Sequence, residues 1–465
     1  MILNNINRVS IKSSNSKLVD GFNWAKEQAI KYINTEDPVG LWYEASLPGR
    51  GAFCMRDVSH QSAGAQILGL SLFTKNMLRK FAENISETRD WCSYWEINKY
   101  NLPAPEDYKN DNDFWYNLPA NFDIIDCCYR QYLWTGDLDY INDPIFLNFY
   151  KRTVDDYVKC WDVNNDGILE YKGHYEYRGI PSYLEYQVGV NKIASACDMI
   201  AAQYRGYVSY SKIHSLRGHT LEAKKYEEKA KELQEIFHSE WWNENNKSYN
   251  TFILENGEFC GASAQDALKG DIQLVTPMPL YYDIIKDVER IKSSINVLLC
   301  AKNINIETES HYPEVLYKNN YNKEAYDIIM DLVNPNKKRR EYPEVSYSVI
   351  GNIITGILGI IPDSTKRLIE TTPKLSEDVP WIEFDNIPIF NNEVSIRCFA
   401  NKEVTFINKG GESILWKAAF STNVDELMVD GIKVKAQKEE NIHGSILSYV
   451  EIPVYENEQH IVRVI

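Results

Sequence analysis

The sequence lacks the features that mark membrane, secreted or nucleic-acid-binding proteins. No window approaches 18 uninterrupted apolar residues, so no membrane span is expected. The N-terminus has no basic region followed by an apolar stretch, so no secretory signal is visible and we expect a cytoplasmic protein. The chain carries 50 Lys and Arg against 66 Asp and Glu, and its net charge of −16 disfavours a nucleic-acid partner. Its one dense basic run, at 337–340, is too short to form a binding stripe.

Signatures of cofactor and metal chemistry are also missing. There is no P-loop, no GxGxxG, no GxSxG and no HExxH. Nine cysteines without a CxxC pair indicate reduced, buried thiols and no zinc site. Asp162–Gly167 matches the opening of an EF-hand, but Gly173 stands where that loop needs a bidentate Glu. We therefore expect a tight turn there, with a loose calcium site as the alternative, and no resident metal or cofactor.

Tyrosine and tryptophan, by contrast, are abundant. The chain has 31 Tyr and 11 Trp, more than an apolar core requires. Both residue types combine a flat apolar face with a polar edge, which suits a core and also suits the face of a sugar ring. Abundance alone does not distinguish these two uses, so the positions of the aromatic residues have to decide.

Periodicity divides the chain into a helical part and a β-rich part. From Val379 onward, short β-rich segments alternate with turns at Asn391-Asn392, Gly410-Gly411 and Asp430-Gly431. We place an all-α domain at residues 1–372 and a C-terminal antiparallel β-sandwich-like domain at 373–465. A helical body this large favours a toroid of paired helices over a simple bundle. Apolar residues recur at helical spacing in Leu18–Ile33, His60–Phe81 (with Ser59 as its cap), Ile124–Trp134, Ile145–Trp161, Val190–His214, Leu221–Phe237, Ile284–Cys300, Ala325–Val333 and Val345–Leu358.

Long loops between these helices hold the candidate site residues. One polar loop contains Arg56, Asp57 and His60, where Asp57 is either a first-turn helix carboxylate or part of a ligand-contacting group. A carboxylate in a partly dry aromatic loop can have a raised pKa and serve as a general acid, and glycoside hydrolysis needs a second carboxylate as its partner. The other candidates are aromatic residues of a second loop (Trp95 and Trp115, with Glu96), carboxylates of the middle loop (Glu170, Glu176, Glu185) and late carboxylates (Glu307, Glu309, Glu314, Glu341, Glu344).

Three stretches resemble the six-hairpin glycosidases, enzymes built on an (α/α)6 toroid such as trehalases, α-L-rhamnosidases and glucoamylases. They are the Asp/Gly-rich turn at Asp162–Glu170, the hairpin from Val188 to Asn250, and the segment from Glu344 to Gly359-Ile360-Ile361-Pro362-Asp363. The resemblance implies an (α/α)6 toroid followed by a β-domain. By position it implies that Glu176 (or Glu185) is the general acid and Glu344 (or Glu341) the general base of an inverting glycoside hydrolase.

We therefore expect a glycosidase that acts on a small oligosaccharide or glycoside. Its catalytic residues would be Glu176 and Glu344, and its substrate-binding residues Arg56, Asp57, His60, Trp95, Glu96, Trp115, Glu185, Glu309 and Glu341. Two alternatives remain. One is a sugar epimerase or polysaccharide lyase on the same toroid, with His60, His174 or His311 as the base. The other is a non-catalytic carbohydrate-binding protein.

Overall fold

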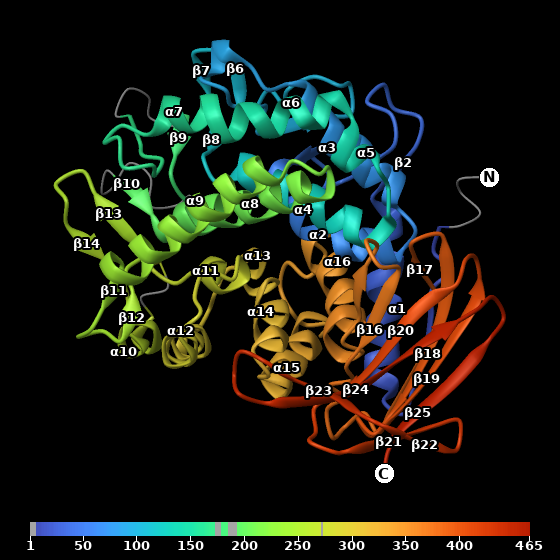
Figure 1. The fold of residues 1–465 in the computed structure, drawn as a ribbon. Coiled ribbons are helices and arrows are strands. Elements are labelled where there is room, and N and C mark those ends of the chain that lie inside the picture. Colours follow the sequence, from blue (N-terminus) through green and yellow to red (C-terminus); the bar gives the residue numbers. More distant parts are fainter. Residues whose placement is uncertain (1–5, 173–177, 185–192, 271–272) are drawn as a thin grey trace.

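The computed structural model describes residues 6–172, 178–184, 193–270 and 273–465. A helical part comes first, and a β-domain lies against one side of it (Figure 1). The helices are α1 (Ser16–Lys31), α2 (Met55–Ile67), α3 (Ser71–Glu83), α4 (Ala120–Thr135), α5 (Asp139–Asn142), α6 (Pro144–Arg152), α7 (Val158–Trp161), α8 (Cys197–Leu216), α9 (Thr220–Glu240), α10 (Ala264–Lys269), α11 (Met278–Tyr281), α12 (Val288–Cys300), α13 (Ile306–Glu309), α14 (Tyr312–Lys318), α15 (Asn322–Leu332) and α16 (Pro343–Asn352), with a 3-10 turn η2 (Glu87–Arg89) and π-helical turns η3 (Thr153–Tyr157) and η5 (Ile353–Ile357).

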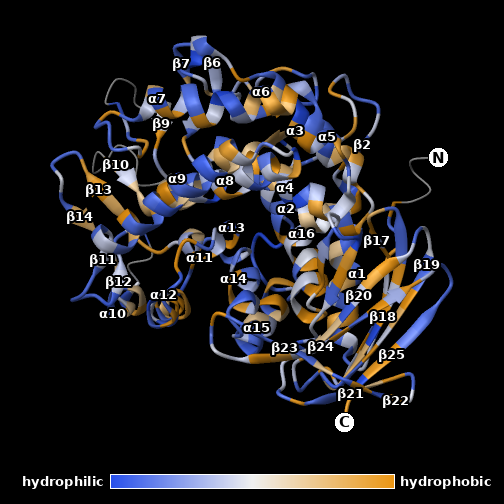
Figure 2. Ribbon diagram, in the orientation of Figure 1, coloured by the Kyte–Doolittle hydropathy of each residue, from blue (hydrophilic) through white to orange (hydrophobic). Residues whose placement is uncertain are grey.

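The helices pack in an inner and an outer set. Among the inner helices, α2 packs on α4, α4 on α8, α8 on α11 and α11 on α14, while α14 contacts η5, the continuation of α16, and α16 packs on α2. Outer helices cover them: α1 on α16, α3 on α2, α9 on α8 and α15 on α14. Hydrophilic residues predominate along α9, as expected of an outer helix (Figure 2).

Periodicity located the helices but not all their ends. The predicted run His60–Phe81 is two helices, α2 and α3, because Gly69 between them has a φ of +80° that a helix does not allow. The prediction that Ser59 caps this run is wrong, because α2 already begins at Met55 and Ser59 lies inside it. The run from Val190 contains strand β10 (Ile193–Ala196) before α8 begins at Cys197.

The prediction of an all-α helical part is also incorrect in detail, because its loops form small sheets. Six strand sets occur in the described part of these loops: β2 (Ile33–Asn34) with β3 (Trp42–Tyr43), β4 (Ala52–Cys54) with β5 (Glu96–Asn98), β6 (Tyr108–Asn110) with β7 (Asp113–Phe114), β8 (Tyr116–Asn117) with β9 (Arg178–Ile180), β10 with β13 (Phe252–Leu254) and β14 (Phe259–Cys260), and β11 (Trp242–Asn243) with β12 (Ser248–Tyr249).

The β-domain consists of two sheets. The seven-stranded sheet has the order β1 (Ser10–Ser13), β17 (Trp381–Ile389), β18 (Asn392–Phe399), β19 (Glu403–Gly410), β25 (Gln459–Val464), β21 (Glu426–Val429), β22 (Ile432–Lys435). The five-stranded sheet has the order β15 (Ile361–Asp363), β16 (Leu368–Thr371), β20 (Ile414–Phe420), β24 (Ile446–Val454), β23 (Gln437–Glu440). Phe406 of β19 stacks on Trp416 of β20 at 5.1 Å between ring centroids, so aromatic side chains from the two sheets form the core between them.

Three strands of this domain come from before residue 373. Strand β1, near the N-terminus, pairs antiparallel with β17, and β15 and β16 belong to the second sheet. The pairing is not wholly antiparallel either, because β16 and β20 run parallel. Phe22 of α1 packs edge-on against Phe384 of β17 at 5.1 Å, which joins the helical part to the sheet. Within the described residues, no helix is both long enough and apolar enough to span a bilayer.

Candidate active site

Four buried carboxylates mark the site, each in the first turn of an inner helix. They are Asp57 of α2, Asp123 of α4, Asp198 of α8 and Glu344 of α16, and each side chain belongs to a residue no more than 4% exposed. The partial positive charge at a helix N-terminus favours a carboxylate at this position. Because α2 contacts both α4 and α16, and α4 contacts α8, these helix starts gather acidic groups from distant parts of the sequence.

Glu344 and Asp57 form a carboxyl pair. The pKa of Glu344 is raised well above its usual value, first by burial and then by the charge of Asp57 and a hydrogen bond with it. Arg56 opposes the shift, and its Nε lies 3.2 Å from Asp57 Oδ1. A hydrogen bond between two carboxyl groups requires a proton on one of them, and the raised pKa lets Glu344 keep its proton to a higher pH than a free glutamate does.

Two neutral histidines stack beside the pair. The rings of His60 and His311 are 3.5 Å apart at an interplanar angle of 11°, and Tyr281 meets both edge-on. Burial lowers the pKa of His311 to about 3, and burial, followed by the charge of His311, lowers that of His60 well below its usual value.

Backbone contacts determine which nitrogens of these rings carry the protons. The Glu307 carbonyl oxygen lies 3.0 Å from His311 Nδ1 and accepts a hydrogen bond from Ser310 Oγ at 2.7 Å. A carbonyl can only accept, so His311 Nδ1 carries the proton and Nε2 is left as an acceptor. Since Ser310 has donated its proton, His60 donates from Nε2 to Ser310 Oγ at 2.9 Å. The buried His60 Nδ1 is then an acceptor that has no partner among the described residues.

Asp123 links α2 and α4 to the loop before α8. It accepts hydrogen bonds from Ser59 Oγ at 2.8 Å and from the Tyr183 hydroxyl at 3.2 Å. Burial raises its pKa to about 6, although the charge of Arg130 opposes the shift. Asp198 fixes the same loop, because it accepts from the Tyr183 amide at 2.7 Å and from Ser182 Oγ at 2.9 Å.

A cavity of about 260 Å³ adjoins this cluster, but none of the four buried helix-start carboxylates is among the lining residues that the structure describes. Arg56, Tyr183 and His311 form its polar side, and Val275, Pro277 and Met278 part of its apolar side. The guanidinium of Arg56 lies 5.7 Å from the Tyr183 ring and 5.9 Å from the Trp95 ring, so two aromatic faces hold it. An apolar pocket with a few convergent polar groups is the usual form of a small-molecule site.

Several of the predicted residues meet here. Arg56, Asp57, His60 and Glu344 form one cluster, and Trp95 packs against Arg56. Glu96 lies deeper in the same loop, where its carboxylate is 2.8 Å from Arg50 and where burial, followed by hydrogen bonding and repulsion from Asp107, raises its pKa to about 9.

Of the late carboxylates, Glu307 lines the cavity, and Arg339 Nη2 lies 2.7 Å from its Oε1. The remaining predicted residues are not part of the described lining. Glu309 is paired with Lys337 at 2.7 Å, one residue from Thr308 in the cavity wall. Trp115 packs partly buried against the core, and Glu341 is exposed, with only its carbonyl bonded to Tyr32 and Gln28. Glu176 and Glu185 lie outside the described residues, as does His174.

The site also contains residues that the sequence did not single out. These are Asp123, Asp198, Tyr183 and Ser310. The first two share a signal that could have found them, namely a carboxylate in the first turn of an inner helix. Ser310 and Tyr183 act through contacts with residues far along the chain, which no local pattern reveals.

The Asp162–Gly167 turn agrees with the tight-turn prediction. Asp162 accepts hydrogen bonds from the amides of Asp166 and Gly167, both at 3.0 Å. Glu170 closes the same loop, accepting from the Val163 amide at 2.8 Å and the Asn164 amide at 3.1 Å. Across the part of the chain that the structure describes, no three His, Cys, Asp or Glu side chains are grouped to hold a metal ion.

Comparison with known proteins gives a fold and no sequence relative. No protein-family model matches the sequence, and no curated protein matches it. The solved structures similar to it include a family 78 rhamnosidase from Bacillus sp. GL1 (TM-score 0.63, 13% identity, 86% of this chain and 40% of that one) and the α-L-rhamnosidase from Dictyoglumus thermophilum (TM-score 0.61, 13% identity, 99% and 51%). The α-L-rhamnosidase from Aspergillus terreus is also similar (TM-score 0.57, 14% identity, 97% and 51%).

The chain thus spans about half or less of the length of these three proteins. At 13–14% identity the likeness concerns the fold. It covers the helical part and the β-domain together, since 97–99% of this chain is included in two of the three. The predicted resemblance to the six-hairpin glycosidases is therefore confirmed at the level of the fold.

Proposed function

We propose that this chain is a cytoplasmic glycoside hydrolase with an (α/α)6 toroid, acting on a small oligosaccharide or glycoside with inversion. The succession of inner-helix contacts from α2 through α4, α8, α11 and α14 back to α16 supports a closed ring. The observation that carries the catalytic proposal is the Asp57–Glu344 carboxyl pair. Arg56 contacts this pair and lines a cavity of monosaccharide size.

The pair would act as the general base. A carboxyl pair with one proton still has one negative charge, and it can take up a proton from an attacking water, as the paired carboxylates of aspartic proteases do. The two groups are too close to flank a glycosidic bond, which requires about 5–9.5 Å between acid and base. The general acid must therefore come from a third carboxylate, and Glu176, with Glu185 as the alternative, keeps that role in the proposal.

In the proposed reaction, water attacks the anomeric carbon while the Asp57–Glu344 pair removes its proton. The acid protonates the leaving oxygen as the glycosidic bond breaks, so the two protons balance. Arg56 would hold the negative charge of the pair and hydrogen-bond to the sugar. His311 Nε2, an acceptor that stays unprotonated near neutral pH, would receive a hydrogen bond from a sugar hydroxyl.

The test is turnover of a panel of aryl glycosides, rhamnosides included, and natural disaccharides. We expect one sugar class to be hydrolysed, and we expect Glu344→Gln and Asp57→Asn to lower kcat by about 100-fold or more. Glu341→Gln, an exposed carboxylate on the same segment, is the matched control. Proton NMR of the first-formed anomer tests inversion. Full activity in Glu344→Gln would refute the assignment.

A second candidate function is favoured by the histidine pair. A neutral His311 with a free Nε2 beside the cavity could abstract a proton next to a carbonyl or carboxylate, as an epimerase or lyase requires. A product of unchanged mass would identify an epimerase, and ultraviolet absorbance of an unsaturated uronate would identify a lyase. Sugar binding without any turnover would instead indicate a carbohydrate-binding protein.

A further inference from the structure

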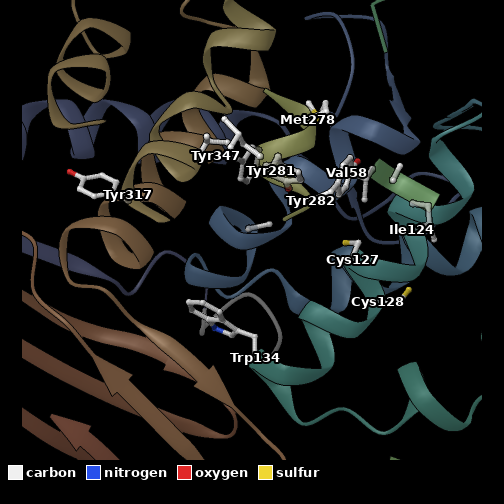
Figure 3. Close-up of a cluster of buried hydrophobic side chains, with 14 of the residues drawn as sticks. Val58, Ile124, Cys127, Cys128, Trp134, Met278, Tyr281, Tyr282, Tyr317 and Tyr347 are labelled. Atoms are coloured by element: carbon white, nitrogen blue, oxygen red, sulfur yellow. The ribbon is translucent and has the colours of Figure 1, made fainter. Parts of the chain in front are cut away.

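A second cavity lies further along the same inner helices, where they meet the β-domain. Its volume is about 450 Å³. The wall includes Gln131 and Trp134 near the end of α4, Tyr317 near the end of α14, and Lys374 in the segment after β16. Figure 3 shows Trp134 at the end of α4, directed toward the strands of the β-domain, where its Nε1 donates to the Pro388 carbonyl at 3.0 Å.

A buried polar atom of this wall has no hydrogen-bond partner among the described residues. Gln131 is 2% exposed, and its Oε1 accepts no hydrogen bond from them. The Gln131 amide nitrogen donates to the Ser62 carbonyl at 3.3 Å, so its oxygen must be the atom left over. A buried polar group without a partner destabilises the fold, so a ligand that supplies a partner here would gain affinity.

The wall also has a cation without a carboxylate. Lys374 Nζ donates to the Tyr317 carbonyl at 2.7 Å, and no carboxylate among the described residues lies within ion-pair distance of it. The neighbouring charges are already matched, because Glu370 pairs with Lys417 at 3.0 Å and Glu314 with Lys318 at 3.2 Å. Burial lowers the pKa of Lys374 to about 8, and a nearby anion would reverse this shift.

We propose that this junction cavity is a second binding site, which takes a monosaccharide-sized polyol bearing one anionic group, a carboxylate or a phosphate. The anion pairs with Lys374, and a hydroxyl donates to Gln131 Oε1. Trp134 and Leu133 form an apolar wall for the less polar face of the ring. The volume lies within the range of small-molecule sites and far exceeds that of one water.

The experiment is calorimetric titration of the full chain with glucuronate, glucose 6-phosphate, glucose and inorganic phosphate. We expect at least one sugar anion to bind, and Lys374→Met to weaken it about tenfold, the effect of one charge-assisted hydrogen bond. The relative affinities of glucuronate and glucose 6-phosphate then identify the anionic group.

Two control variants locate the binding. Lys366→Met removes an exposed charge from the turn between β15 and β16. Glu344→Gln alters the candidate active site instead of the junction cavity. Both variants should bind the anion as the wild type does. The proposal fails if no probe binds at millimolar concentration, if Lys374→Met binds unchanged, or if glucose binds as tightly as the anions. Equal binding of inorganic phosphate and glucose 6-phosphate would refute the polyol contacts. Because no step here uses glycosidase activity, failure of the proposed function would leave this result unaffected.

Discussion

The Glu344 carboxyl group hydrogen-bonds to that of Asp57, across the starts of two helices that come from opposite ends of the helical part. Helices α2 and α16 hold the two groups together by direct packing. The pair is thus a property of the tertiary structure, and its proton affects both stability and the proposed chemistry.

The first prediction concerns the stability of Glu344→Gln. The raised pKa means that neutral Glu344 stabilises the fold fully below about pH 4.5, the unfolded value, and that this stability is lost as the pH rises toward the folded pKa. Gln cannot ionise, so we expect the variant to be more stable than wild type at pH 8 by about 1–3 kcal/mol, with a smaller difference at pH 5. Urea unfolding at both values measures this. A variant that is less stable at pH 8 would contradict the shared proton.

The second prediction concerns the pH dependence of unfolding. His60 and His311 have folded pKa values below the unfolded value of about 6.5, so the unfolded state binds more protons below that pH. The contribution of the two neutral histidines to the free energy of unfolding is therefore fully present above about pH 6.5. It falls as the pH decreases, by up to about 1.4 kcal/mol per pH unit for each histidine. We expect His311→Asn to show a shallower fall between pH 7 and pH 5 than wild type.

The third prediction tests Arg56. Its charge lowers the pKa of Glu344, so Arg56→Met should raise the pKa at which the pair becomes active as a base. We expect the acidic limb of the kcat profile to move to higher pH and kcat to fall about 10- to 100-fold. Arg463→Met, an exposed residue of the β-domain, is the control. An unshifted limb would show that Arg56 binds substrate without affecting the pair.

The fourth prediction uses the close contact between α2 and α16. A Cβ on Gly64 would lie 2.1 Å from the Tyr347 carbonyl oxygen, so a side chain there would push the two helices apart. We expect Gly64→Ala to lower the free energy of unfolding by about 2–3 kcal/mol or more and to reduce activity, because it separates Asp57 from Glu344. Gly410→Ala, whose Cβ would have only one atom within reach at 4.0 Å, should cost less than 1 kcal/mol. Equal losses in both variants would contradict the explanation.

Much of the fold was predictable from the sequence because helices and hairpins are local. Helical spacing located most of the helices, and the Asp430-Gly431 signal lies at the turn between β21 and β22. The pairing of β1 with β17 could not be predicted, because four residues near the N-terminus carry no mark of a partner close to residue 385. The small sheets in the loops could not be predicted either, because strands of two or three residues are too short to show a period of alternating residues.

The candidate site was predictable as a set of residue types rather than as an arrangement. Arg56 and Asp57 were identified because they lie in a dense polar loop, and Glu344 was identified by its position in the resemblance to the six-hairpin glycosidases. Asp57 bonds to Glu344 because α2 packs on α16. No local pattern in the sequence shows that these two helices are neighbours. Asp123 was overlooked because its hydrogen-bond donors, Ser59 and Tyr183, are far from it in the sequence and meet it only in the folded chain.

The position of β1 has a consequence for the order of assembly. Residues 10–13 are synthesised before the helical part, but their hydrogen-bonding partners in β17, at 382–385, are made only after it. The native seven-stranded sheet therefore cannot form during synthesis of the helical part, and β17 presents an open edge until β1 docks. Deletion of residues 6–14 should leave that edge exposed and make the chain prone to self-association through it.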